Sequence, residues 1–203
     1  MLKLLSFLLI LLSATPIFAA ERSILVYGDS LSAGFGIPLA QSWPALLGQR
    51  LQPAGWTVVN ASISGETTAG GRSRFDTTLN QTKPDIVILA LGANDGLRGL
   101  PVKNMRENLF YMITAAKKQN ARVLLTGIRL PPNYGDDYTR EFEYSFRELA
   151  KREKLPFVPF LLAPIADDRS AFQTDNLHPV AGVQPKILDH VWVTLKPMLG
   201  TGK

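Results

Sequence analysis

The chain has 203 residues, of which 22 are lysine or arginine and 17 are aspartate or glutamate, so its formal net charge is +5. It contains no cysteine, which excludes disulfides, thiolate metal sites, a cysteine nucleophile and lipid attachment through cysteine. The basic residues are scattered rather than gathered in a stripe, so we expect no nucleic-acid partner.

The N-terminal segment has the pattern of a secretory signal peptide. Lys3 precedes an apolar run over residues 4–12, and the segment ends in small residues near Ala19. The apolar run is too short to predict a membrane span, and an uncleaved anchor is the alternative. We therefore expect removal of residues 1–20, export to the periplasm or into the medium, and no stable membrane anchor. The remaining residues, 21–203, suffice for one domain with a sizeable core.

Apolar runs alternate with helical patterns along the rest of the chain. Strands are expected at Ile24–Tyr27, Trp56–Val59, Ile86–Leu91, Val123–Thr126 and Phe157–Phe160. The third run is continuously apolar, as in the middle of a parallel sheet, and Pro159 favours an edge position for the last. Apolar residues at helical spacing predict helices at Trp43–Leu51, Ala69–Gln81, Val102–Gln119, Tyr138–Lys154 and about Gln184–Leu195.

Five strands that alternate with five helices predict an α/β fold, a doubly wound parallel sheet in a single domain. Functional sites in such folds lie beyond the carboxyl ends of the strands. Candidate catalytic residues follow the first, second, third and fifth strands, so we expect them at one edge of the sheet: Ser30, Gly65, Asn94, Asp175 and His178.

Ser30 and His178 are the candidate nucleophile and base. A serine hydroxyl becomes nucleophilic when a base takes its proton and a third group orients that base. The chain has only two histidines. His190 lies inside a helical pattern and is interpreted as structural or exposed. His178 precedes Pro179, which disfavours helical geometry there. The alternative for Ser30 is a serine that only caps a helix.

Asp175 is the preferred partner of the base, because it lies three residues before His178 and can accept a hydrogen bond from its ring. Other acids compete for this role: Asp29, Asp95, Asp167 and Asp168. The oxyanion that forms on attack needs fixed donors. The backbone N–H of Gly65 and the side-chain amide of Asn94 can supply them.

Four blocks of the sequence resemble those of the SGNH (GDSL) hydrolases. They are Gly28-Asp29-Ser30-Leu31-Ser32, Ser64-Gly65-Glu66-Thr67, Gly92-Ala93-Asn94-Asp95 and Asp175-x-x-His178-Pro179. The resemblance covers nearly all of residues 21–203. It implies a flavodoxin-like three-layer α/β/α fold with five parallel strands, a Ser30–His178–Asp175 triad, and an oxyanion hole formed by Ser30, Gly65 and Asn94.

The resemblance further implies a serine esterase. We expect it to be a monomer, and to act without cofactor or metal because the chain has no cysteine and only two histidines and its site needs no Lewis acid. Its expected substrates are aryl and acyl esters, fatty acyl thioesters and lysophospholipids. A carbohydrate O-acetylesterase is the rival activity, and a non-catalytic lipid- or glycan-binding module is the rival from another class. Loops after the third and fourth strands are expected to bind the acyl chain, through the apolar residues Leu97, Leu100, Leu130, Pro131, Pro132 and Tyr134.

Overall fold

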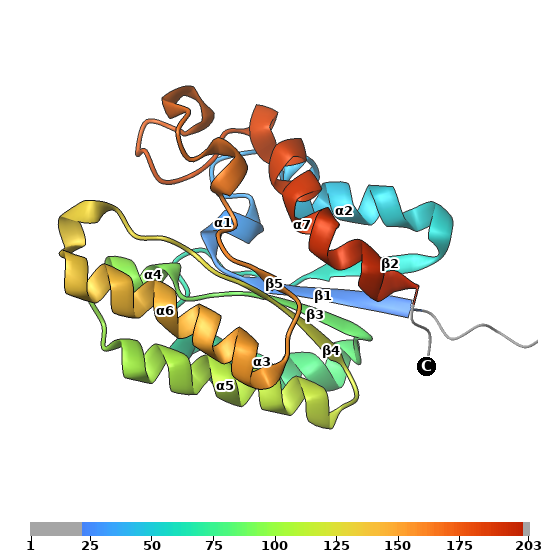
Figure 1. Cartoon of the computed structure of the whole chain (residues 1–203). Coiled ribbons are helices and arrows are strands. Elements are labelled where there is room, and N and C mark those ends of the chain that lie inside the picture. Colours follow the sequence, from blue (N-terminus) through green and yellow to red (C-terminus); the bar gives the residue numbers. More distant parts are fainter. Residues whose placement is uncertain (1–21, 201–203) are drawn as a thin grey trace, which may run out of the picture.

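A five-stranded parallel sheet forms the centre of the molecule (Figure 1). The computed structural model describes residues 22–200. The strands, in the spatial order β2-β1-β3-β4-β5, are β1 (Arg22–Gly28), β2 (Trp56–Asn60), β3 (Ile86–Ala90), β4 (Arg122–Thr126) and β5 (Phe157–Val158). The order reverses between β1 and β3, which in open parallel sheets is where ligands bind.

Helices cover both faces of the sheet. Residues 22–200 contain α1 (Ser30–Ala33), α2 (Trp43–Leu51), α3 (Thr68–Thr82), α4 (Ala93–Leu97), α5 (Val102–Lys118), α6 (Asp136–Glu153) and α7 (Gln184–Leu199). In Figure 1, α2 and α7 lie on one face, and α3, α5 and α6 on the other. The three-layer α/β/α arrangement predicted from the sequence is therefore confirmed.

Each face of the sheet contributes to its own core. In β1, Leu25 and Tyr27 pack toward α3 and α5, whereas Ile24 and Val26 pack toward α2 and α7. Successive side chains of a strand point to opposite faces, so a strand covered on both sides must be apolar at every position. The central strand β3 is buried along its whole length.

The observed elements agree with the predicted ones to within two residues at most boundaries. The last helix is longer than predicted. It continues through Pro197 to Leu199, and Met198 in its final turn is buried in the core. The last strand is shorter, because Pro159 has no N–H to extend the ladder. The short helices α1 and α4 have too few residues to show a helical period.

None of the helices in residues 22–200 is both long and apolar enough to cross a membrane. The expected signal peptide, residues 1–20, lies outside the described residues. Its removal, and the start of the domain at residue 21, therefore stay predictions.

Candidate active site

Ser30 is the first residue of α1, and only Asp29 separates it from Gly28, the last residue of β1. The side chain of Asp29 accepts a hydrogen bond from the N–H of Leu31 at 3.1 Å and caps this short helix. Gly34 ends the helix with a φ of 79°, a left-handed conformation that favours glycine. The chain therefore turns sharply at both ends of α1, which holds Ser30 at the carboxyl edge of the sheet.

His178 lies between Ser30 and Asp175. Its Nε2 is 2.8 Å from the Ser30 Oγ, and its Nδ1 is 2.7 Å from the Asp175 Oδ2. Because a carboxylate only accepts hydrogen bonds, we assign the ring proton to Nδ1, which leaves Nε2 to accept from the serine hydroxyl. In this arrangement the imidazole is oriented by the carboxylate and is placed to take the hydroxyl proton.

The Asp175 carboxylate is held by its own turn. Its Oδ1 accepts from the backbone N–H of Leu177 at 2.9 Å and of His178 at 3.0 Å. Partial burial favours the neutral acid, but these two bonds and the bond from the His178 ring outweigh it and lower the pKa of Asp175 to about 2. Asp175 therefore stays negatively charged at neutral pH, where it can stabilise an imidazolium.

Two candidate donors follow β2 and β3, the strands on either side of β1. Gly65 has a φ of 78°, and its carbonyl accepts from the Arg98 guanidinium at 2.8 Å. The Asn94 amide donates one N–H to the carbonyl of Glu66 at 3.0 Å. A primary amide has a second N–H, so this bond orients Asn94 and leaves one donor for a ligand. Ser30, Gly65 and Asn94 all line the same cavity.

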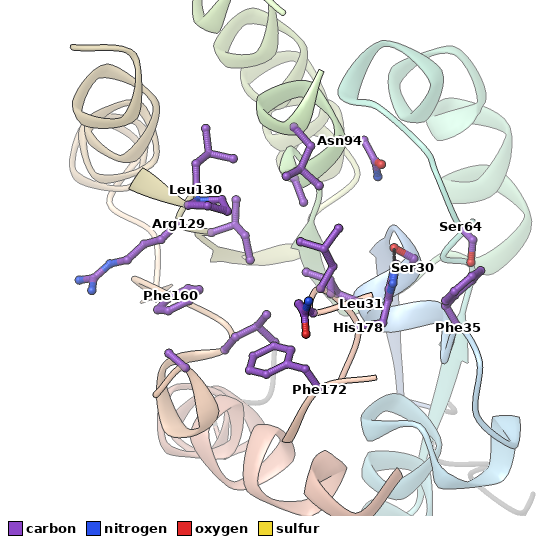
Figure 2. Close-up of a pocket in the computed structure, with 18 of the residues that line it drawn as sticks. Ser30, Leu31, Phe35, Ser64, Asn94, Arg129, Leu130, Phe160, Phe172 and His178 are labelled. Atoms are coloured by element: carbon purple, nitrogen blue, oxygen red, sulfur yellow. Dashed lines mark hydrogen bonds between the residues drawn. The ribbon is translucent and has the colours of Figure 1, made fainter. Parts of the chain in front are cut away.

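This cavity has a volume of about 660 Å³ (Figure 2). It runs from the Ser30–His178 pair along loops that follow β4 and β5. Apolar side chains dominate its wall, among them Leu31, Phe35, Ile128, Leu130, Phe160, Leu162, Phe172 and Leu177. A site of this size and lining suits a small apolar ligand with one polar group at the reactive end.

The loop residues predicted to bind the acyl chain divide into two groups. Leu97, Leu130 and Pro131 line the cavity, whereas Leu100 and Tyr134 are not among its lining residues. The hydroxyl of Tyr134 instead donates to the carbonyl of Leu97 at 3.1 Å, so Tyr134 supports a wall residue from behind. The side chain of Pro132 lies outside the described parts of the structure.

Comparison with known proteins identifies the family. The sequence profile of the GDSL-like Lipase/Acylhydrolase family matches residues 26–182. The chain belongs to this family. Its members are hydrolases, and the relatives described next are named for ester hydrolysis, so the protein is an enzyme that acts on ester bonds.

Curated relatives of this GDSL-like hydrolase cover most of its length. Esterase TesA of Pseudomonas aeruginosa is 45% identical over 183 residues, which are 89% of this chain and 91% of the relative. An arylesterase of Vibrio mimicus is 42% identical, over 94% of this chain and 96% of its own. Thioesterase 1/protease 1/lysophospholipase L1 of Escherichia coli is 39% identical, over 89% and 86%.

Solved structures agree with the fold of this hydrolase. The crystal structure of TesA superposes with a TM-score of 0.84 at 44% identity, covering 87% of this chain and 99% of that one. The psychrotrophic esterase EstA from Pseudoalteromonas, inhibited by monoethylphosphonate, also gives 0.84, at 37% identity over 89% and 100%. The flavodoxin-like sheet implied by the resemblance is therefore confirmed.

The other acids considered as partners of the base have different surroundings in the hydrolase. Asp29 is buried at the N-terminus of α1, and burial raises its pKa to about 7. Asp95 accepts from the N–H and the hydroxyl of Thr68 at 2.7 and 2.6 Å, and burial raises its pKa too. Asp168 caps a turn, and Asp167 lies in the cavity wall. His190 bonds the carbonyl of Phe160 at 3.0 Å, as expected of a structural histidine.

Several cavity residues of the hydrolase were not predicted from the sequence. Phe35, Phe160, Phe172 and Leu177 lie in loops, where an apolar residue has no periodic pattern to show which way it points. One local signal existed for Phe35, because it stands between two glycines only a few residues after Ser30. Within residues 22–200, no group of three or more histidine, cysteine, aspartate or glutamate side chains could hold a metal ion.

Proposed function

We propose that the protein is an exported serine esterase in which Ser30 is the nucleophile, His178 the general base and Asp175 the group that orients it. The observation that carries this proposal is the continuous chain of contacts from the Asp175 carboxylate through both ring nitrogens of His178 to the Ser30 hydroxyl. A serine in this arrangement can lose its proton as it attacks.

Acylation begins when the Ser30 Oγ attacks the acyl carbon and its proton moves to the His178 Nε2. The negative charge that develops on the acyl oxygen is stabilised by the N–H groups of Ser30 and Gly65 and by the free N–H of Asn94. The intermediate collapses, His178 gives its proton to the departing alcohol or thiol, and the acyl group stays on Ser30. Water activated by His178 then hydrolyses this acyl-enzyme, and the serine is restored.

The proposed substrates are esters with apolar acyl chains. Leu130, Phe160 and Phe172 form apolar wall on the side of the cavity away from Phe35 (Figure 2). An acetyl group would leave most of the 660 Å³ unfilled, which favours longer chains over a carbohydrate O-acetylesterase. The relatives named arylesterase, thioesterase and lysophospholipase support aryl esters, acyl thioesters and lysophospholipids as the classes to test.

Export to the periplasm is proposed from the sequence alone, on the charged start, apolar run and small-residue end of residues 1–20. N-terminal sequencing of the protein recovered from the periplasm tests it. A mature N-terminus next to Ala19 or Ala20 is expected, and a protein that keeps Met1 and sediments with membranes would contradict export without an anchor.

Hydrolysis of p-nitrophenyl esters with increasing acyl length tests the proposed activity. We expect turnover to rise with acyl-chain length until the cavity is filled, and to be lost in Ser30→Ala. Turnover of acetyl esters alone would favour the O-acetylesterase. Binding of long esters without any turnover would favour a non-catalytic lipid-binding module.

A further inference from the structure

Phe35 contacts the proposed base directly. Its ring centroid is 4.3 Å from that of His178, and the two planes are tilted by 37°. Phe35 is nevertheless 48% exposed and lines the cavity. A partly exposed aromatic ring forgoes the stabilisation that burial of its apolar surface would give. The imidazole of His178 covers part of the Phe35 ring, and the exposed remainder is available to a ligand.

The position of Phe35 is fixed by Gln173. The Gln173 amide donates to the carbonyl of Phe35 at 2.8 Å and to that of Pro179 at 3.2 Å. The backbone N–H of Gln173 donates to the carbonyl of His178 at 2.8 Å. A Cβ on Gly36 would lie 2.2 Å from the Gln173 side-chain oxygen, so glycine lets the two loops approach. The loop of Phe35 and the loop of the base are thus joined.

Phe35 lies on one side of the reactive centre. Figure 2 shows Phe35 and Ser64 to one side of Ser30 and His178, and Leu130, Phe160 and Phe172 to the other. The carbonyl carbon that Ser30 attacks carries two substituents that point in different directions. One is the acyl chain, and the other is the departing oxygen or sulfur with its attached group. The larger apolar side suits the acyl chain, which leaves the side of Phe35 for the departing group.

Proton transfer places the departing group on the same side. His178 must give its proton to the departing atom, so that atom lies next to the His178 Nε2. Phe35 stacks on that same imidazole. A flat aromatic group attached to the departing oxygen therefore comes within reach of the exposed part of the Phe35 ring, where offset or edge-to-face packing is favourable.

We propose that Phe35 forms a binding site for the departing group and gives the enzyme a preference for esters of aromatic alcohols. This inference rests on the proposed function, because it assigns a second part of the same site. Phe35 makes the contact, and Gln173 acts through it as a positioning residue. The acyl side of the cavity is not involved in this preference.

The test compares naphthyl acetate with trifluoroethyl acetate in the wild type and in Phe35→Leu. Both esters form the same acetyl-enzyme, and kcat/KM reports only the steps up to acylation. The intrinsic reactivity of each ester cancels when the ratio of the two kcat/KM values is compared between variant and wild type. An effect of Phe35 on His178 itself cancels as well, since both esters use the same base.

We expect Phe35→Leu to lower the naphthyl-to-trifluoroethyl ratio about three- to tenfold, the range of one lost aromatic pair. Phe35→Trp should keep the ratio at or above the wild-type value. Gln173→Ala should lower it in the same direction, and should add little in the Phe35→Leu background. Phe172→Leu is the matched control on the acyl side, and it should leave the ratio unchanged while altering acyl-length preference.

An unchanged ratio in Phe35→Leu would overturn the proposal. So would an equal loss on both esters, which would make Phe35 only a support for His178. Labelling of Ser30 by a fluorophosphonate, measured in the wild type and each variant, separates this failure from that of the proposed function. If Ser30 is labelled and the naphthyl-to-trifluoroethyl ratio does not change, only the Phe35 site is refuted. If Ser30 is not labelled in the wild type, the esterase mechanism is refuted and the Phe35 site with it.

Discussion

Replacement of Asp29 by asparagine should stabilise the protein in alkaline solution. Asp29 is 1% exposed, and its Oδ2 has no hydrogen-bond partner within the described chain. Burial, with the nearby charges of Asp95 and Glu66, raises the pKa of Asp29 to about 7 against the opposing bond from Leu31. Asparagine keeps an oxygen that can accept from the Leu31 N–H, and it has no charge to bury.

The size of the effect follows from proton linkage. A folded-state pKa near 7 against an unfolded value of 3.8 is a difference of about 3 units, or about 4 kcal/mol. Over this range the folded state holds the proton and the unfolded state does not. The stability from protonated Asp29 is therefore fully present below about pH 4 and is lost as the pH rises through about 7. Between about pH 5 and pH 8 the loss is about 3 kcal/mol.

Thermal unfolding of wild type and Asp29→Asn at about pH 5 and about pH 8 measures this loss. The Tm of the variant relative to that of the wild type should rise by about 5–10 °C between the two conditions. Asp168→Asn is the matched control. Hydrogen bonds from Ser170 lower the pKa of Asp168, so that side chain stays charged in both conditions and its Tm difference should be constant.

A Tm difference between Asp29→Asn and wild type that is the same at both pH values would contradict this prediction. It would mean that burial does not penalise the Asp29 carboxylate, because the groups around it solvate its charge.

Other predictions concern catalysis. Asn94→Ala should lower kcat by about 10²–10³ with little change in KM, since the oxyanion contact strengthens as charge develops; a change in KM alone would assign Asn94 to substrate binding. His178→Ala should abolish ester hydrolysis and His190→Ala should not, and the reverse result would identify the wrong base. Phe160→Ala should flatten the rise of kcat/KM with acyl length, which is about fourfold per methylene while the cavity fills, and should spare acetyl esters. Activity should survive exhaustive chelation, and a loss that added zinc or magnesium restores would contradict a serine mechanism.

The fold was largely predictable because its buried strands appear in the sequence as apolar runs and its helices as apolar residues at helical spacing. The apolar run at Ile86–Leu91 indicates a strand covered on both faces, and β3 is such a strand. The helical spacing from Met105 to Ala116 matches the buried face of α5. The end of α7 was not predictable, because burial of Met198 outweighs the local effect of Pro197.

The residues that come together in the candidate site could be predicted from the sequence, but the loop paths and contacts that bring them together could not. The rule that strand ends share an edge brings Ser30, Gly65 and Asn94 together. The 2.8 Å contact between Ser30 and His178 joins residues 148 positions apart, and it depends on the path of the loop after β5. Loop paths are set by tertiary contacts, such as the bond from Gln173 to Phe35, which no local pattern encodes.

Reaction with a fluorophosphonate, followed by peptide mass spectrometry, shows whether Ser30 is the nucleophile. We expect one adduct per chain, on Ser30, formed in proportion to the loss of ester hydrolysis. A folded Ser30→Ala variant should show neither adduct nor hydrolysis. An adduct on another residue, or full hydrolysis by Ser30→Ala, would contradict this role of Ser30.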